Sequence, residues 1–93
     1  MSNQFEWDEQ KARSNLWKHG ISFLEAATTF EDQMAILLAD PDHSQGESRF
    51  VLLGFSGLGR LLVVSFTDRP PFVRLISARR ATPSERRHYE EES

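Results

Sequence analysis

The sequence contains no cysteine, so it can form neither a disulfide framework nor a thiolate zinc site. No apolar run approaches the roughly 20 residues that a membrane-spanning helix needs. Residues 1–4 also lack the basic and apolar regions of a secretory signal peptide. His43, near Asp40 and Asp42, is the only grouping with suitable metal ligands, and carboxylates in a loop beside a proline have commoner explanations. We therefore expect a cytoplasmic protein that uses no metal ion or other cofactor.

Lysine is scarce: Lys11 and Lys18 are the only two, whereas the chain of 93 residues carries nine arginines. The net charge of −3 is unevenly distributed, because residues 1–48 sum to −6 and residues 49–89 sum to +6. All cations of the second segment are arginines, whose planar donor fork suits phosphate oxygens. This segregation can build a basic surface on an acidic protein. The same arginines could equally be solvated positions of strands and helices.

The first third of the chain predicts a short strand followed by two helices. Phe5-Glu6-Trp7 alternates apolar and polar residues, as a strand does. Asp8 as N-cap and Gly20 as stop signal bound a helix over 8–19. Ser22 and Glu25 form a capping box that begins a second helix over 22–31. The link between the helices is short, so we expect a helical hairpin.

The remainder predicts four strands, over 34–38, 49–55, 60–67 and 72–80, and a helix over 83–91 that begins at the capping box of Thr82 and Glu85. Connections of this length favour an antiparallel meander. A chain this short closes a single core, so residues 1–93 should form one domain. The expected fold class is α+β: an antiparallel sheet with the helical hairpin on one face and a short C-terminal helix.

Several motifs, each weak alone, are specific in their order and spacing from residue 5 to about residue 90. They are Phe5-Glu6-Trp7-Asp8-Glu9, Lys11-Ala12, Asn15, Lys18-His19-Gly20, Phe23, Glu25-Ala26, Phe30, Asp42-His43-Ser44, Gly46-Glu47, Arg49-Phe50, Ile76-Ser77-Ala78-Arg79-Arg80-Ala81, Glu85-Arg86-Arg87 and Tyr89. With these motifs the sequence resembles the BrnT toxins of type II toxin–antitoxin systems.

The resemblance implies a RelE-like fold and a metal-independent endoribonuclease whose substrate is RNA. It also implies a BrnA-type antitoxin with a ribbon-helix-helix domain, and an assembly of two toxins with two antitoxins. Contact with operator DNA would be made only through the antitoxin.

Cleavage of RNA without a metal requires the 2′-OH to attack its own phosphate. Cations fixed around the developing phosphorane charge usually supply the largest share of such a rate. An arginine cluster suits this role, but arginine stays protonated and cannot accept the hydroxyl proton. No residue of the sequence stands out as the general base.

Alternation along the strand predicted over 72–80 selects the candidate arginines. Val73 and Leu75 supply an apolar face for the helices, so Arg74 and Arg80 should lie on the opposite, open face. A RelE-like fold places its RNA on that face. We therefore expect Arg74 and Arg80 to bind phosphate and to take part in catalysis.

Three further residues of the strands are candidates. Arg49 opens its strand and could join the cluster, or simply face solvent. Arg79 could also join it, or pair with an acid of the helical hairpin. Thr67 lies near the end of the third strand of the meander and is expected to contact RNA.

Lys18, His43 and Tyr89 complete the candidate residues. Lys18 could reach over the sheet edge toward RNA, or cap its own helix. His43 lies in a polar loop and could transfer a proton, since an unperturbed histidine has a pKa of about 6.5, or it could be one more turn residue. Tyr89, on the last helix, could contact RNA or pack its ring on the core. His19 favours a capping role at its helix C-terminus.

The main alternative to an RNA-cleaving toxin is a non-catalytic binding module of the same fold, whose basic sheet face holds a protein or nucleic acid. The lack of an obvious general base favours this alternative. A sequence-specific DNA binder is disfavoured, because no helix combines a basic face with a helix-turn-helix arrangement. Trp17 lies off the apolar stripe of its helix, and either this surface or the sheet edge is where we expect the antitoxin to bind.

Overall fold

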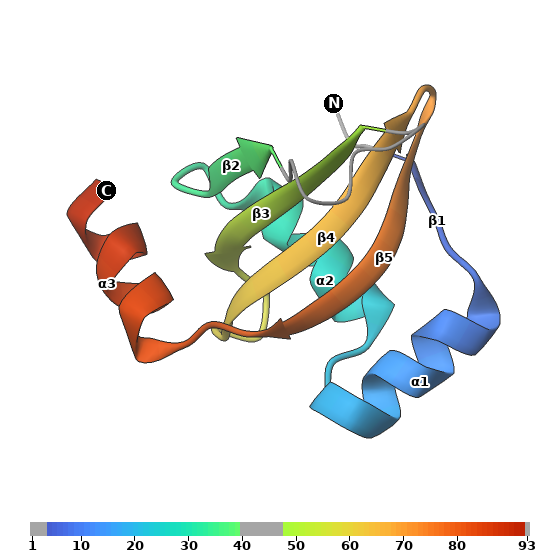
Figure 1. The fold of residues 1–93 in the computed structure, drawn as a ribbon, viewed down its shortest axis with the longest axis horizontal. Helices are drawn as coiled ribbons and strands as arrows, with labels where there is room; N and C mark the ends of the chain where they lie inside the picture. The colour runs from blue at the N-terminus through green and yellow to red at the C-terminus, as the bar shows by residue number, and fades with distance from the viewer. Residues whose placement is uncertain (1–3, 40–47, 93) are drawn as a thin grey trace.

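A computed structural model of the chain describes residues 4–39 and 48–92. Its elements follow the order β1 (Gln4–Glu6), α1 (Glu9–His19), α2 (Phe23–Thr28), the 3₁₀ turn η1 (Thr29–Glu31), β2 (Ile36–Ala39), β3 (Arg49–Phe55), β4 (Leu61–Arg69), β5 (Phe72–Arg80) and α3 (Pro83–Glu92). The strands form one sheet in the order β1-β5-β4-β3-β2 (Figure 1).

Strands β2 to β5 form the predicted antiparallel meander, and the expected α+β class is confirmed. The short strand β1 pairs with β5 in parallel, with Phe5 opposite Val73. This pairing covers only Phe72–Arg74 of β5. Beyond Arg74 the outer edge of β5 therefore has no strand neighbour within 4–39 and 48–92, and α1 lies along it instead (Figure 1).

Two of the differences from the predicted bounds arise because short polar side chains bind the backbone. The second helix tightens to a 3₁₀ turn at Thr29, since the hydroxyls of Thr28 and Thr29 donate to the carbonyls of Glu25 and Ala26 at 2.6 and 2.7 Å. Strand β2 begins two residues later than predicted, because Asp32 accepts the backbone N–H of Met34 at 2.9 Å and holds a turn there.

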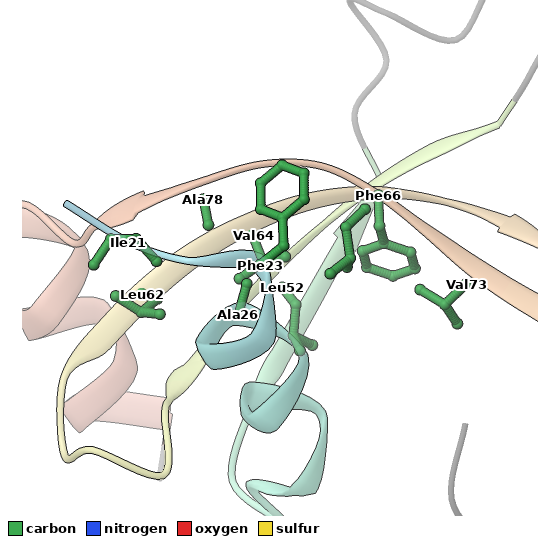
Figure 2. Close-up of a cluster of buried hydrophobic side chains, with 10 residues drawn as sticks. Ile21, Phe23, Ala26, Leu52, Leu62, Val64, Phe66, Val73 and Ala78 are labelled. Atoms are coloured by element: carbon green, nitrogen blue, oxygen red, sulfur yellow. The ribbon is translucent and has the colours of Figure 1, made fainter. Parts of the chain in front are cut away.

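The main core lies between the sheet and the two N-terminal helices. Figure 2 shows Phe23 and Ala26 of α2 turned toward side chains of the strands. The buried members of this cluster are Ile21, Phe23, Ala26, Leu52, Leu62, Val64, Phe66, Val73, Leu75 and Ala78. The sheet face that these residues form is here called the helix face.

The opposite side of the sheet, here called the open face, is only partly covered. Helix α3 packs Tyr89 on Leu53, Leu61 and Val63, which point away from the main core. The two ends of the chain thus contribute helices to opposite faces. At the other end of the strands, where β1 pairs with β5, the open face carries the polar side chains of Arg49, Thr67 and Arg74.

A one-residue β-bulge interrupts the pairing of β4 with β5. Ser65 lies opposite Ser77, whereas the next residue, Phe66, lies opposite Leu75. Ile76 is therefore the extra residue, and the alternation of side chains along β5 shifts at this point. As a result, Ala78 joins Leu75 in the core of the helix face.

Asn15 fixes α1 against the bulged strand. Its side-chain amide donates to the carbonyls of Ile21 and Ala78, both at 2.9 Å, and its side-chain oxygen accepts the N–H of Ala78 at 2.9 Å. The residue is 5% exposed. A single side chain thus satisfies backbone groups that a neighbouring strand would otherwise pair.

Replacing Asn15 with Ala should destabilise the protein by at least about 2 kcal/mol, because each buried polar group left unpaired costs about 1–3 kcal/mol. The loss would occur although alanine is the better helix former. Urea unfolding measures the change, with Ser14→Ala, one residue away and exposed, as the control expected to stay within about 0.5 kcal/mol. A stability of Asn15→Ala equal to that of the control would contradict this role.

Candidate functional site

Three polar side chains form a row across the open face, at the end of the strands where β1 pairs with β5. Thr67 of β4 lies opposite Arg49 of β3 on one side and opposite Arg74 of β5 on the other. Side chains directly opposite each other share a face and lie about 5 Å apart at Cβ. Arg49, Thr67 and Arg74 are here called the arginine row.

The hydroxyl of Thr67 has no hydrogen-bond partner among the residues that the structure describes. The residue is 2% exposed, and its Oγ1 atom is buried without a hydrogen bond to any described residue. Buried polar groups are nearly always satisfied, so an exception calls for an explanation. Lying between two arginines, this hydroxyl becomes a donor to a ligand with oxygen acceptors if the side chains that cover it move aside.

The two arginines of the row differ in their ion pairs. Arg49 makes no ion pair with a residue in 4–39 or 48–92. Arg74 donates to Glu6 of β1 at 3.3 Å, and both side chains are about one-third exposed, at 33% and 32%. Exposed pairs of this kind contribute little, because water screens them. Both guanidinium groups are therefore available to an anion.

Arg79 also lies on the open face, in the register pair with Val63, and is held by α3. Its guanidinium donates to both carboxylate oxygens of Glu85 at 2.9 Å. The bond with Arg79 lowers the pKa of Glu85 to about 2. The alternative in which Arg79 pairs with an acid was correct in kind, but the acid belongs to α3 and not to the helical hairpin.

The prediction that Arg80 lies beside Arg74 is wrong. Arg80 pairs with Leu62, a core residue, so it is on the helix face. The bulge at Ile76 is the physical reason, because it moves every later residue of β5 to the other side. There Arg80 contributes to lowering the pKa of Glu25, for which the hydrogen bond from Arg60 is the largest cause.

Tyr89 is a core residue. It is 8% exposed, packs edge-to-face on Phe55 and donates its hydroxyl to Asp32 at 2.7 Å. Burial, followed by the bond to Asp32, raises its pKa to about 12. The expected RNA contact is therefore wrong, and the alternative that its ring packs on the core is what the structure shows.

Lys18 is not part of the arginine row. Lys18 is exposed on α1 and lines a pocket of about 260 Å³ between α1 and β5. His43 lies outside the described residues. Sequence reasoning missed Ser77, which the bulge turns to the open face opposite Ser65 and which also lines this pocket.

The described residues contain neither a metal-binding cluster nor a membrane-spanning helix. No group of three or more His, Asp or Glu side chains within 4–39 and 48–92 could hold a metal ion. No helix in the same ranges is long and apolar enough to cross a membrane.

Comparison with known proteins identifies the family. Residues 7–85 match the family described as "Ribonuclease toxin, BrnT, of type II toxin-antitoxin system". The chain belongs to the BrnT family. The resemblance drawn from the sequence motifs is thereby confirmed, and a BrnT toxin acts on RNA and is paired with an antitoxin.

The fold agrees with a solved BrnT structure. The chain is similar to the ribonuclease toxin BrnT of Brucella abortus, known from a crystal structure, with 24% sequence identity and a TM-score of 0.68. The match covers 87% of this chain and 99% of that one. Among curated proteins, none matches the chain.

Replacing Thr67 with Val keeps the shape of the side chain and removes the unpaired hydroxyl. Because burial of an unsatisfied polar group is unfavourable, Thr67→Val should leave stability unchanged or raise it by about 1 kcal/mol. Urea unfolding tests this expectation, and Thr29→Val is the control. The hydroxyl of Thr29 is buried but donates to Ala26 at 2.7 Å, so its loss should destabilise. Equal destabilisation by both substitutions would show that Thr67 has a structural partner.

The Arg79–Glu85 pair should make the stability of the protein depend on pH in the acidic range. The pKa of Glu85 is lowered in the folded protein, so its contribution is complete above about pH 4.5 and is lost as the pH falls toward 2. Thermal melts over this range should show a smaller loss of Tm for Glu85→Gln than for the wild type. Glu90→Gln, at an exposed position of the same helix, should keep the wild-type profile. Identical profiles for all three proteins would contradict the linkage.

Proposed function

We propose that the arginine row binds the scissile phosphate of RNA, which is cleaved without a metal ion. The observation that carries this proposal is the buried, unpaired hydroxyl of Thr67 between Arg49 and Arg74, in a chain of a ribonuclease toxin family. Such a row offers a neutral donor and two cationic donors to the same group. A phosphate diester, with charged oxygens in several directions, uses all three.

The chemistry follows from the charge that develops on phosphorus. The 2′-oxygen attacks the adjacent phosphorus, the bond to the 5′-oxygen breaks, and the products are a 2′,3′-cyclic phosphate and a 5′-hydroxyl end. In the phosphorane the non-bridging oxygens gain charge, which Arg49 and Arg74 stabilise while Thr67 Oγ1 donates a hydrogen bond. These donors are held by paired strands, so little reorganisation is needed when the charge appears.

Two protons must also move, and the arginine row cannot accept one, because its arginines stay protonated. The 2′-hydroxyl loses a proton to a base, and the leaving 5′-oxygen gains one. We propose that His43 is the base that takes the proton of the 2′-hydroxyl. It precedes Arg49 in the chain, and histidine side chains titrate near neutral pH. Its substitution by Gln should remove the base without removing phosphate binding.

The antitoxin is proposed to be of the BrnA type, with a ribbon-helix-helix domain. Two toxins would assemble with two antitoxins in the cytoplasm, and operator DNA would contact only the antitoxin. Support for a protein partner on the helical side comes from large apolar side chains left exposed there: Leu16 is 53% exposed, Trp17 86% and Leu24 73%. This surface is separate from the open face.

The test is RNA cleavage by purified protein with EDTA present. The wild type should cleave, and Arg49→Ala with Arg74→Ala should slow cleavage at least about 100-fold, since a single oxyanion donor is typically worth 10²–10³-fold. Arg13→Ala, on the far side of α1, removes a cation outside the row and should cleave normally. Thr67→Val should cleave slowly although it folds at least as stably as the wild type.

Two outcomes would overturn the proposal. Cleavage at the wild-type rate by the double variant would show that the phosphate binds elsewhere. Intact RNA that stays bound to the wild type would instead establish the alternative function, a binding module without chemistry.

A further inference from the structure

The pocket between α1 and β5 is basic and is separate from the arginine row. Its α1 wall is formed by Lys11, Ser14, Asn15 and Lys18, with His19 at the end of the helix. The first four are spaced i, i+3, i+4 and i+7, so they share one face of the helix. That face is turned toward β5, where Ser77 lines the opposite wall.

The charged side chains that line this pocket are all basic. None of its lining residues is acidic, and Lys11, Lys18 and His19 make no ion pair with a residue in 4–39 or 48–92. The acids of α1 lie at the start of the helix, where Asp8 accepts the backbone N–H of Gln10 at 2.7 Å as N-cap. Two ammonium groups thus line a pocket of about 260 Å³ that has no acidic residue in its walls, although Asp8, at the start of α1, interacts electrostatically with Lys11.

The walls of the pocket are fixed by the fold. Strand β1 ends its pairing at Arg74, which leaves the following edge of β5 to α1. The buried side chain of Asn15 then ties α1 to both backbone groups of Ala78. The pocket is therefore built from a helix and a strand that are held together, and its cations are pre-positioned.

The pocket is continuous with the open face through Ser77. This residue lies opposite Ser65, which is two residues from Thr67 on the same face of β4. Along β5, Ser77 is three positions after Arg74, or roughly 10 Å of strand. An extended chain of phosphates lying on the arginine row could thus pass over the edge of β5 into the pocket.

We propose that this pocket is a second phosphate site, which binds the backbone of the RNA next to the cleaved bond. Lys11 and Lys18 supply positive charge, and the hydroxyls of Ser14 and Ser77 supply hydrogen-bond donors. None of these groups distinguishes one RNA base from another. The inference rests on the proposed function, because it extends the RNA path that begins at the arginine row. It assigns Lys18 to substrate binding and gives it no part in the chemical step.

The test uses an uncleavable 2′-O-methyl oligoribonucleotide, whose affinity is measured at several salt concentrations. Each phosphate neutralised on a single strand contributes a slope of about −0.7 in log K against log salt. Lys11→Ala with Lys18→Ala should weaken binding and reduce the slope by about 0.7. Arg13→Ala removes a cation from the other side of the same helix and should leave the slope unchanged.

Shortening the oligonucleotide from each end locates the site. The wild type should lose affinity in one step when the flanking phosphate is removed, and the double lysine variant should lack that step. Lys11→Gln with Lys18→Gln keeps the polar, exposed helix surface and should behave like the alanine pair, which excludes a folding effect.

The two hypotheses fail in different ways. If the wild type neither cleaves nor binds RNA, the proposed function is wrong. If the wild type cleaves RNA but the lysine variants keep its slope and its truncation step, only the second phosphate site is overturned.

Discussion

One extra residue in β5 determines to which face of the sheet the later side chains of that strand point. The bulge at Ile76 lets Leu75 and Ala78, three positions apart, both enter the core beneath the helices. Without it, strict alternation would place Ala78 outside and Ser77 in its place, so a hydroxyl would be buried against the helices. With it, Arg74, Ser77 and Arg79 all lie on the open face. Core packing and the side chains that extend the open face toward α3 thus depend on the same irregularity.

The arginines nearest the site are in three different electrostatic conditions. Arg49 has no acidic partner within 4–39 and 48–92, Arg74 shares a screened contact with Glu6, and Arg79 is held by both oxygens of Glu85. The guanidinium groups of the row are therefore more available to an anion than the guanidinium group held by α3. The hydroxyl of Thr67 lies at the available end, where a buried donor without a partner is tolerated at some loss of stability.

Local signals predicted the helices well, because their causes are local. Asp8 caps α1 through the N–H groups of Gln10 and Lys11, Gly20 ends it with a φ of 70°, and Ser22 accepts the N–H of Glu25. The meander followed from apolar runs and short turns. The parallel position of β1 could not be predicted in this way, since it depends on contacts with residues almost 70 positions away.

The sequence predicted the candidate site only in part, and Arg80 and Tyr89 show why. Arg74 lies on the open face as predicted, because it precedes the bulge, and the register of β3, β4 and β5 places Arg49 and Thr67 beside it. Arg80 was misplaced by a bulge that no glycine marks in the sequence. Tyr89 was misassigned because its partner, Asp32, is 57 residues away and gave no local signal.

The attachment of α3 has a consequence for any anion that reaches the far end of the open face. Arg79 gives Glu85 one N–H of each terminal nitrogen, so a phosphate that uses its other N–H groups would meet the charge of that carboxylate. Glu85 is also the residue that accepts the N–H of Thr82 at the start of the helix. Ligand and helix therefore compete for one guanidinium. By linkage, whatever loosens α3 strengthens anion binding at Arg79, and an anion bound there loosens α3 by the same factor.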